Sequence, residues 1–421
     1  MSPSARTQDV IVVGGGPAGS STAFALARGG ARVLVLDRAV FPRTKPCAEY
    51  LSPQASRILS AMGALDAVEQ RAAHLTGMVV RAPNGAMLRG DFVAGHGFRA
   101  FRDRGLALRR TVLDPILLQC ARGAGAEVRE GVRVTDVERD ATGRVCGVRI
   151  LDERGSPDSL RAPLVIGADG LRSLVARRLG LSHLSRWPKR LALVAHLEHV
   201  GDMQEWGELH VERDVGYVGL ASVDAGLTNV AMVVSPRDAR AVSADRAAFF
   251  LDWLRARPQL APRMRGARLA SAVQVTGPFG SHARRSWAPG VALVGDAADF
   301  FDPFTGEGIY AGLRGGELLA PFALAALGAT SARAADHALA GYHRARRTEF
   351  AGKWIVERLI GAAVGWAPAM NYFARTLEAR KDMADLLVGV TGDFVPAREV
   401  LRPGYLLNLF RPSGSSPASG A

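Results

Sequence analysis

Residues 9–38 read DVIVVGGGPAGSSTAFALARGGARVLVLDR, and this stretch decides the predicted fold. Val10–Val13 is rich in residues that favour strands, Ser20–Arg28 has the composition of a helix, and Arg32–Leu36 is again rich in strand formers. A glycine-rich turn separates the first strand from the helix. The stretch therefore predicts a βαβ unit that opens an α/β domain of the Rossmann type.

The turn GGGPAG at residues 14–19 follows the G-x-G-x-x-G pattern. Its first glycine permits a tight turn, the second lets the backbone approach a pyrophosphate, and the third lets the helix pack close to the sheet. The helix N-terminus offers unpaired N–H groups to the anion, and an acid ending the second strand binds an adenosine ribose. The motif alone does not distinguish NAD from FAD. The residues predicted to hold the dinucleotide here are Gly14, Gly16, Pro17, Ala18, Gly19, Asp37 and Arg38.

The composition is that of a globular enzyme with two joined domains, since the chain has 421 residues of which 48% are hydrophobic and 22% charged. The net charge of +13 comes almost wholly from arginine, because lysine occurs at only four positions. These arginines are scattered rather than clustered, so we expect no nucleic-acid partner. Attraction to an anionic membrane surface stays open.

Three widely spaced cysteines predict neither a disulfide framework nor a metal cluster, and no histidine has the spacing of a metal ligand. The N-terminus lacks the pattern of a signal peptide, and the apolar runs are shorter than the ~18 residues that a spanning helix needs. We therefore expect a cytoplasmic protein without a metal, and we leave open a peripheral contact with the inner face of the membrane. The oligomeric state is not predicted.

The order of elements along the chain predicts a discontinuous nucleotide-binding domain. Residues 190–236 are rich in alternating strands that could form an antiparallel sheet, and the chain is chiefly helical from Gly312 onward. The predicted segments are 1–75, 101–182 and 277–330 for the Rossmann-like domain, 76–100 and 183–276 for an α+β substrate domain with an antiparallel sheet, 331–412 for a helical C-terminal region, and 413–421 for a disordered tail.

Two further motifs follow apolar strands: GADG at 167–170 and GDAA at 295–298. With the glycine turn, they resemble the FAD-dependent oxidoreductases of the two-domain, hydroxylase-like group, over roughly residues 8–315. The resemblance implies FAD as the cofactor. It places Asp169 in the pyrophosphate region, Gly295 and Asp296 on the ribityl chain, and Arg110 near the phosphates, although Arg109 could take that role.

Within that group, the loops FPRTKPCAEYLSP at 41–53 and PFTGEGI at 303–309 are most similar to the geranylgeranyl reductase family. Ala48 and Tyr50 depart from the small glycines often found in the first loop. The reductases' Tyr-x-Trp-x-Phe-Pro-like strand is only partly present here, because this chain keeps its tyrosine but neither the tryptophan nor the proline. The resemblance implies that this tyrosine, Tyr217, binds substrate. The Trp-x-Trp-x-Ile-Pro stretch of the related halogenases is absent, so halogenation is disfavoured.

The second loop is expected at the reactive ring of the flavin. A reduced flavin carries negative charge, and a turn that runs into a helix offers N–H donors and a helix dipole to it. Glu307 is expected to favour that dipole rather than to orient substrate, and Glu49 to hold its own loop. The residues assigned to the ring are Gly306, Glu307, Gly308 and Ile309, and those assigned to the flavin or substrate face are Cys47, Pro303 and Phe304.

Three reactions remain open. The first is NAD(P)H-driven reduction of C=C bonds in a hydrophobic, isoprenoid-like substrate; the second is hydroxylation of an aromatic or polyketide-type substrate; the third is quinone-linked electron transfer. The chain has no second G-x-G-x-x-G motif, so a nicotinamide donor would approach the flavin transiently. Cys47 is expected either to assist protonation or only to pack. The C-terminal helices are expected to cap the substrate cleft, with a membrane patch as the alternative.

Overall fold

A six-stranded sheet grows around the predicted βαβ unit in this computed structural model, which describes residues 8–185, 190–213 and 216–410. Four of its strand pairs are parallel, and only the edge strand β21 runs antiparallel to its neighbour. The predicted disordered tail at 413–421 lies outside the described residues. In spatial order the strands are β21 (Trp287–Ala288), β22 (Val291–Leu293), β12 (Leu164–Gly167), β1 (Val10–Val13), β2 (Val33–Leu36) and β8 (Glu127–Arg129).

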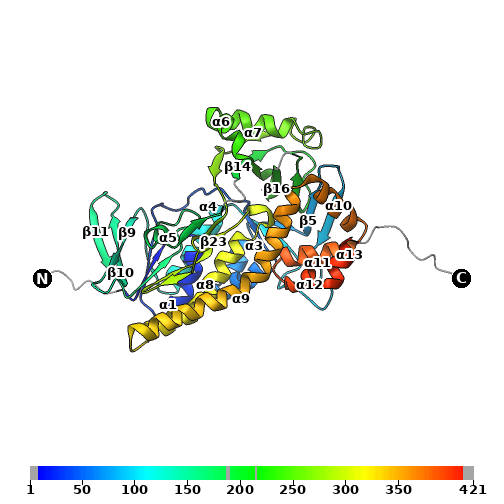
Figure 1. Ribbon diagram of the computed structural model, residues 1–421. Coiled ribbons are helices and arrows are strands. Elements are labelled where there is room, and N and C mark those ends of the chain that lie inside the picture. Colours follow the sequence, from blue (N-terminus) through cyan, green and yellow to red (C-terminus); the bar gives the residue numbers. More distant parts are fainter. Residues whose placement is uncertain (1–7, 186–189, 214–215, 411–421) are drawn as a thin grey trace.

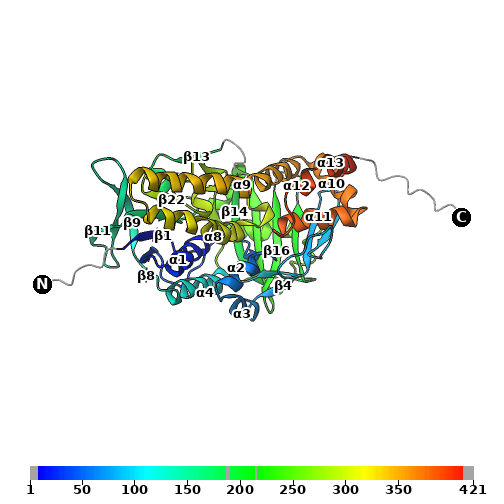
Figure 2. The same ribbon diagram turned by 90° about the horizontal axis from the view of Figure 1, so that it is seen from below.

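Both faces of this sheet are buried because its central strands alternate with a period of two between two apolar layers. Val10 and Val12 face the helices α1, α4, α8 and α9, whereas Ile11 and Val13 face α5 and a small three-stranded sheet within residues 133–161. Figures 1 and 2 show α1, α8 and α9 along one side of the sheet. The helices are α1 (Pro17–Arg28), α4 (Arg110–Gly123), α5 (Leu174–Arg178), α8 (Gly308–Leu327) and α9 (Ala332–Val364).

Small residues let α1 and α8 approach closely. A Cβ added at Gly316 would lie 2.6 Å from the backbone nitrogen of Thr22, and the hydroxyl of Ser21 donates to the Leu313 carbonyl at 2.7 Å. Helix α1 begins at the glycine turn, and α8 begins directly after the loop that ends at residue 307. The packing of the two helices therefore fixes these two loops relative to each other.

The second main sheet is the antiparallel sheet that the fold class predicts, and it contains one parallel strand pair. The sheet is antiparallel except that β5 pairs parallel with β15. The exception arises because β5 enters from the first domain far upstream instead of through a hairpin. Its strands are β18 (Arg268–Leu269), β14 (Leu191–Glu198), β17 (Leu227–Val234), β16 (Tyr217–Asp224), β15 (Trp206–Val211), β5 (Gly77–Arg81) and β6 (Met87–Asp91), with β19 (Gln274–Thr276) also beside β14.

Three small sheets and the remaining helices complete the fold. The small sheets are β11 (Pro157–Arg161) with β10 (Val145–Leu151) and β9 (Arg133–Arg139); β13 (Ser182–Leu184) with β20 (Ser281–Ala283) and β23 (Asp299–Phe300); and β3 (Tyr50–Leu51) with β7 (Gly105–Ala107) and β4 (Ala73–Leu75). The other helices are α2 (Ala55–Ala61), α3 (Leu65–Glu69), α6 (Ala239–Ala244), α7 (Arg246–Arg255), α10 (Ala367–Glu378), α11 (Lys381–Thr391), α12 (Arg398–Leu401) and α13 (Pro403–Phe410), with short 3₁₀ turns at Pro236–Asp238, Gly295–Ala297 and Pro303–Thr305.

The long helix α9 joins the two halves of the molecule. It packs on α8 beside the first sheet and continues to the C-terminal helices, of which α10 and α11 pack on β6 of the second sheet (Figure 1). The predicted fold class is confirmed, including the helical C-terminal region, whereas the exact domain boundaries stay a prediction. Over the described ranges, no helix is both long enough and apolar enough to cross a membrane.

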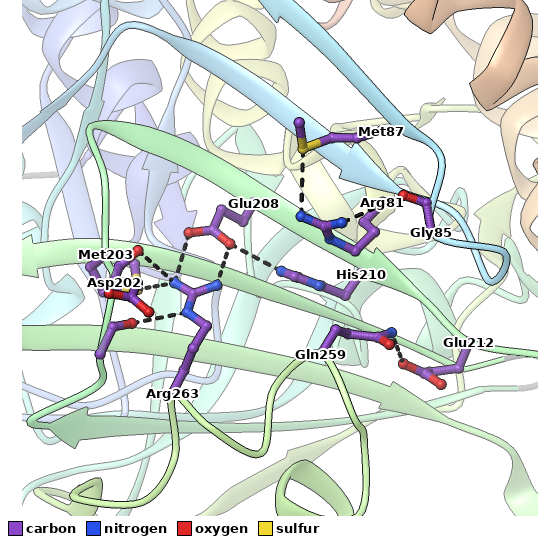
Figure 3. Close-up of polar contacts among 11 residues, drawn as sticks. Arg81, Gly85, Met87, Asp202, Met203, Glu208, His210, Glu212, Gln259 and Arg263 are labelled. Atoms are coloured by element: carbon purple, nitrogen blue, oxygen red, sulfur yellow. Dashed lines mark hydrogen bonds and ion pairs between the residues drawn. The ribbon is translucent and has the colours of Figure 1, made fainter.

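A polar cluster stands on the face of the second sheet that α7 covers (Figure 3). Arg263 donates to both carboxylate oxygens of Glu208, at 2.6 and 2.9 Å, and also to the Gly201 carbonyl at 2.9 Å. The Nε2 atom of His210 lies 3.0 Å from the same carboxylate. Burial raises the pKa of Glu208, but His210 and Arg263 together outweigh that effect and lower it to about 2.

We expect Gly19→Ala to destabilise the fold by at least about 3 kcal/mol, because the added Cβ would lie 1.8 Å from the carbonyl oxygen of Gly14. The matched control is Gly123→Ala at the end of α4, where nothing lies within 4 Å of the added methyl group. The control should be neutral or stabilise by up to about 1 kcal/mol. Urea unfolding measures both variants, and equal midpoints would contradict the close approach.

We expect Glu208→Gln to lower the free energy of unfolding at neutral pH by up to about 3 kcal/mol. The folded-state pKa lies below the ordinary value of 4.5, so this contribution is complete above pH 4.5 and is lost as the pH falls through about 2. The difference between wild type and variant should shrink by roughly 1 kcal/mol from about pH 7 to about pH 4. The exposed Glu205→Gln control should show no such change, and a constant Glu208 difference would refute the assignment.

Candidate functional site

One continuous cavity lies between the two main sheets. The glycine turn at 16–18 and the segment 45–50 line it from the first half of the chain, and β14 to β17 form its opposite wall. The loop at 295–309 and the helix α9 complete the wall. The structure thus brings together the N-terminal motif and the second glycine loop, which are almost three hundred residues apart in the sequence.

The glycine turn has the bare backbone that an anion site requires. Gly14 has a φ of +106°, and a Cβ there would lie 2.5 Å from the Ala168 carbonyl oxygen. A Cβ at Gly16 would face the guanidinium groups of Arg43 and Arg110, at 3.4 and 3.7 Å. Two cations beside an open helix N-terminus form a donor set that fits a pyrophosphate.

Asp37 lies where the sequence predicted an acid. Its carboxylate accepts from the backbone nitrogens of Gly15 and Ala39, both at 2.8 Å, and so braces the glycine turn. Arg38 is exposed and does not line the cavity. The structure therefore gives Asp37 a visible positioning role, while the contact of either residue with an adenosine stays a prediction.

Arg110, rather than Arg109, faces the glycine turn. Arg110 is buried and forms two hydrogen bonds with the Asp114 carboxylate, at 2.7 and 2.8 Å, one helical turn further along α4. Arg109 pairs instead with the exposed Asp224 of β16 at 3.2 Å. Arg43 shares Asp114 with Arg110 at 3.1 Å. The sequence motif did not identify Arg43, because only the folded loop carries it to the turn.

Glu49 connects the Lys45–Pro53 loop to both halves of the molecule. One carboxylate oxygen accepts from the Arg110 backbone nitrogen at 2.8 Å, while the other lies 2.7 Å from His196 Nε2 and 3.0 Å from Asn229 Nδ2. Glu49 is buried and takes a φ of +59°. The expectation that it holds the loop agrees with these contacts.

Cys47 sits on the cavity wall in the same loop. Its Sγ accepts from the Glu49 backbone nitrogen at 3.3 Å, and its carbonyl accepts from Asn229 Nδ2 at 3.0 Å. It is half-buried. These contacts fix the thiol at the wall, and its catalytic role stays a prediction.

Asp296, in the 3₁₀ turn at 295–297, and Lys45 both line the cavity and lie close enough for their charges to interact. Burial lowers the pKa of Lys45, Arg110 lowers it further, and Asp296 opposes both. Among the described residues, none donates a hydrogen bond to the half-buried Asp296 carboxylate. Gly295 takes a φ of +60°, and a Cβ there would lie 2.8 Å from that of Ala18. A free carboxylate this close to the glycine turn fits the hydroxyl groups of a ribityl chain.

Asp169 also has a structural role, at the start of α5, which the resemblance did not imply. Its Oδ2 accepts from the backbone nitrogens of Leu174 and Val175 at 2.6 and 3.2 Å, so it caps α5. Its Oδ1 is buried and has no partner among the described residues, and burial raises its pKa. The unsatisfied oxygen leaves room for a further donor at this position.

The segment before the second glycine loop centres on Asp302, which none of the sequence motifs singled out. Asp302 accepts from the Tyr217 hydroxyl at 2.6 Å and from Arg190 at 3.1 Å. The rings of Tyr217 and Phe304 meet edge to face at 4.9 Å. Burial raises the pKa of the Tyr217 phenol well above 10, and Asp302 raises it further. Tyr217 therefore offers its ring to the cavity, while its hydroxyl is already bound to Asp302.

Glu307 lies at the start of α8, where a carboxylate can favour the helix dipole, and that expected role stays a prediction. It stands at the N-cap of α8 but makes no capping hydrogen bond. Its carboxylate pairs instead with Lys353 of α9 at 3.3 Å, and Lys353 also pairs with Asp393. Burial raises the pKa of Glu307, and Lys353 opposes that shift. The loop is therefore tied to α9, and Gly306, with a φ of +71°, lets it pass the ring of Tyr50.

The structure adds one face of α9 to the site. This face lies about forty residues beyond the last recognised motif, and no local pattern marks it except charged residues within the apolar run KWIVERLIGAAVGW. In the described part of the chain, no cluster of acids, histidines and cysteines could hold a metal ion. The α9 residues that line the cavity are Arg346, Phe350, Lys353, Trp354 and Glu357.

Comparison with known proteins agrees with an FAD site formed by the glycine turn and its neighbouring cations. Residues 7–354 match the model of a family described as FAD binding domain. Menaquinone reductase of Mycolicibacterium smegmatis is 30% identical over 325 residues, which are 74% of this chain and 75% of that protein. Digeranylgeranylglycerophospholipid reductase 2 of Methanopyrus kandleri is 32% identical over 330 residues, which are 76% of this chain and 77% of that protein.

A solved structure resembles the whole arrangement. The myxobacterial chondrochloren halogenase CndH, described as an FAD-dependent halogenase, superposes with a TM-score of 0.78 over 87% of this chain and 86% of its own. Its sequence identity of 24% makes this a likeness of fold. The two-domain flavoenzyme architecture is therefore shared, whereas the reaction is not decided by it.

We expect Asp296→Asn to weaken the binding of FAD by about tenfold, because the amide loses a charge-assisted hydrogen bond to a hydroxyl group. The matched control is Asp252→Asn, an exposed residue of α7 far along the second domain. Fluorescence titration of the flavin-free proteins with FAD measures both affinities. An Asp296 variant that binds FAD as tightly as the control would remove this residue from the site.

Proposed function

We propose that this chain, which belongs to the FAD-binding domain family, uses NAD(P)H to reduce C=C bonds in a hydrophobic, isoprenoid-like substrate. Family membership confirms the predicted FAD-dependent oxidoreductase related to the geranylgeranyl reductases. The direction of the reaction, the electron donor and the substrate are the proposal. The observation that carries it is the apolar wall of the cavity directly beside the predicted flavin site.

The cavity wall supports a hydrophobic substrate. Beyond the glycine turn it is built from aromatic and aliphatic side chains of the 300–304 segment and of the second sheet, and their polar neighbours are mostly paired within the protein. Phe300 packs against Phe279 at 5.5 Å, and Phe304 against Tyr217. Such a surface gains free energy from burying an isoprenoid chain and offers few partners to a polar substrate.

Two matched relatives are themselves named as reductases, of menaquinone and of digeranylgeranylglycerophospholipid. Bound FAD would supply hydride to a carbon of the C=C bond. The residues of this chain that would hold it are the glycine turn, Arg43 and Arg110 at the phosphates, and Asp296 at the ribityl chain. The nicotinamide donor is part of the proposal, and it would approach the flavin transiently because the sequence has no second G-x-G-x-x-G motif.

Contact with a membrane surface stays a prediction. Helix α13 has no buried residue, and Leu407 and Phe410 are 66% and 62% exposed. Phe410 meets the rings of Tyr372 and Phe373 on α10, so the apolar side chains form one patch. Arg402 beside it has a side chain that is 64% exposed. An apolar helix flanked by cations suits the surface of an anionic bilayer.

The decisive experiment supplies the purified yellow protein with NADPH and an isoprenoid lipid such as geranylgeraniol, with and without oxygen. We expect a product heavier by two hydrogen atoms, formed equally well without oxygen, which mass spectrometry detects. A product heavier by one oxygen atom would instead establish the monooxygenase, and it would need oxygen. Reduction of an added quinone without any change in the lipid would favour electron transfer.

A further inference from the structure

Glu357 is an acid without a partner on the wall of the cavity. It lies on α9 one turn after Lys353, and both line the cavity together with Trp354. Within the described ranges, no residue donates a hydrogen bond to its carboxyl group or forms an ion pair with it. The nearest cation on its own helix, Lys353, is already shared between Glu307 and Asp393. The protein therefore leaves this carboxyl group free for whatever occupies the cavity.

The other acids around the same end of the cavity are committed to protein partners. Asp302 accepts from Tyr217 and pairs with Arg190, which is 2% exposed. Asp299 pairs with Arg346 of α9. Burial raises the pKa of Asp302, whereas its contacts with Arg190 and Tyr217 oppose that shift and favour the anion. Glu357 differs from them in having none of these contacts.

Tyr50 carries the second unpartnered polar atom on this wall. Its ring is 6% exposed, and its hydroxyl is buried with no partner among the described residues. Burial raises the pKa of this phenol well above 10, and the nearby Glu307 raises it further. Tyr50 can therefore donate a hydrogen bond to a ligand, but it holds its own proton throughout the neutral range.

The surroundings of Glu357 favour a neutral acid. Burial raises its pKa most, the charge of Glu307 raises it further, and Lys353 partly opposes them, so that it lies at about 8. Asp302 from the neighbouring loop also raises it, and Arg358 on α9 lowers it slightly. A carboxyl group of this kind is protonated at neutral pH and can both give up and regain a proton there.

We propose that Glu357 is the catalytic acid that delivers the proton during reduction of the C=C bond, an assignment that rests on the proposed function. The π bond of the substrate breaks; one carbon receives hydride from the reduced flavin, and the other uses the electron pair to form a C–H bond with the proton of Glu357. The resulting carboxylate regains a proton from water. The net consumption is one NAD(P)H and one proton for each C=C bond.

The first test asks whether the carboxyl group carries a proton, without relying on turnover. Infrared difference spectra of the holoenzyme between about pH 6 and about pH 10 should show a protonated carboxyl band that titrates in this interval. The band should vanish in Glu357→Gln and persist in Glu349→Gln. Glu349 is the matched control because it lies on the same helix but pairs with Arg314 outside the cavity, at 2.7 Å. A spectrum unchanged by Glu357→Gln would overturn the proposal.

The second test separates the two half-reactions. NADPH should reduce the flavin of Glu357→Gln within about threefold of the wild-type rate. Anaerobic re-oxidation of that flavin by geranylgeraniol in detergent micelles should slow by about a hundredfold. The wild-type re-oxidation rate should fall as the pH rises through about 8, and the variant should lack this dependence. The Glu349→Gln control should behave as the wild type in both half-reactions.

The outcomes distinguish this assignment from the function on which it rests. A wild-type protein that is never re-oxidised by the lipid would overturn the reductase proposal and the assignment together. An active wild type with an equally active Glu357→Gln would overturn the assignment alone. Tyr50→Phe and Cys47→Ser test the two competing proton donors. If either variant loses re-oxidation while Glu357→Gln is unaffected, the substituted residue and not Glu357 is the proton donor.

Discussion

The carboxylate of Glu49 is shared between the two halves of the molecule, and the cavity walls keep their spacing because of it. It accepts from the backbone at the start of α4 on one side and contacts His196 of β14 and Asn229 of β17 on the other. Each hydrogen bond contributes about 1 kcal/mol, but a buried donor left without its partner costs about 1–3 kcal/mol. Loss of this carboxylate would therefore release the loop from both sheets at once.

The loop that Glu49 holds also carries the groups that face the cofactor and the substrate. Lys45 and Cys47 precede Glu49 on the cavity wall, and Tyr50 follows it. Because Glu49 takes a left-handed backbone conformation, the chain turns sharply between Cys47 and Tyr50 and presents both toward the cavity. The same constraint thus positions the phosphate end through Arg110 and the substrate end through Tyr50.

The second half of the cavity depends on a different set of buried charges. Lys353 pairs with Glu307 of the second glycine loop and with Asp393 of the C-terminal helical region, and so connects the two. Asp302, just before the same loop, binds Tyr217 of the second sheet. These pairs satisfy one another in a poorly hydrated space, where an unpaired charge is costly. Glu357 is left as the neutral member of the group, which connects the packing of α9 to the chemistry proposed for it.

The sequence by itself determined the βαβ unit, the glycine turn and the alternating strands of the second sheet, because each of these rests on local periodicity or on a contiguous motif. The assignment of FAD came instead from the resemblance of three motifs to a known group of flavoenzymes, and the family match supports it. The structure brings Asp296 and the 306–309 turn to one cavity with the glycine turn, while their contacts with FAD stay a prediction. Only the tertiary structure decided that Arg110 rather than Arg109 faces the turn, that Glu307 pairs with Lys353, and that α9 supplies Glu357. Such pairings depend on which side chains meet between elements that are far apart in the chain, and a local sequence pattern carries no information about those contacts.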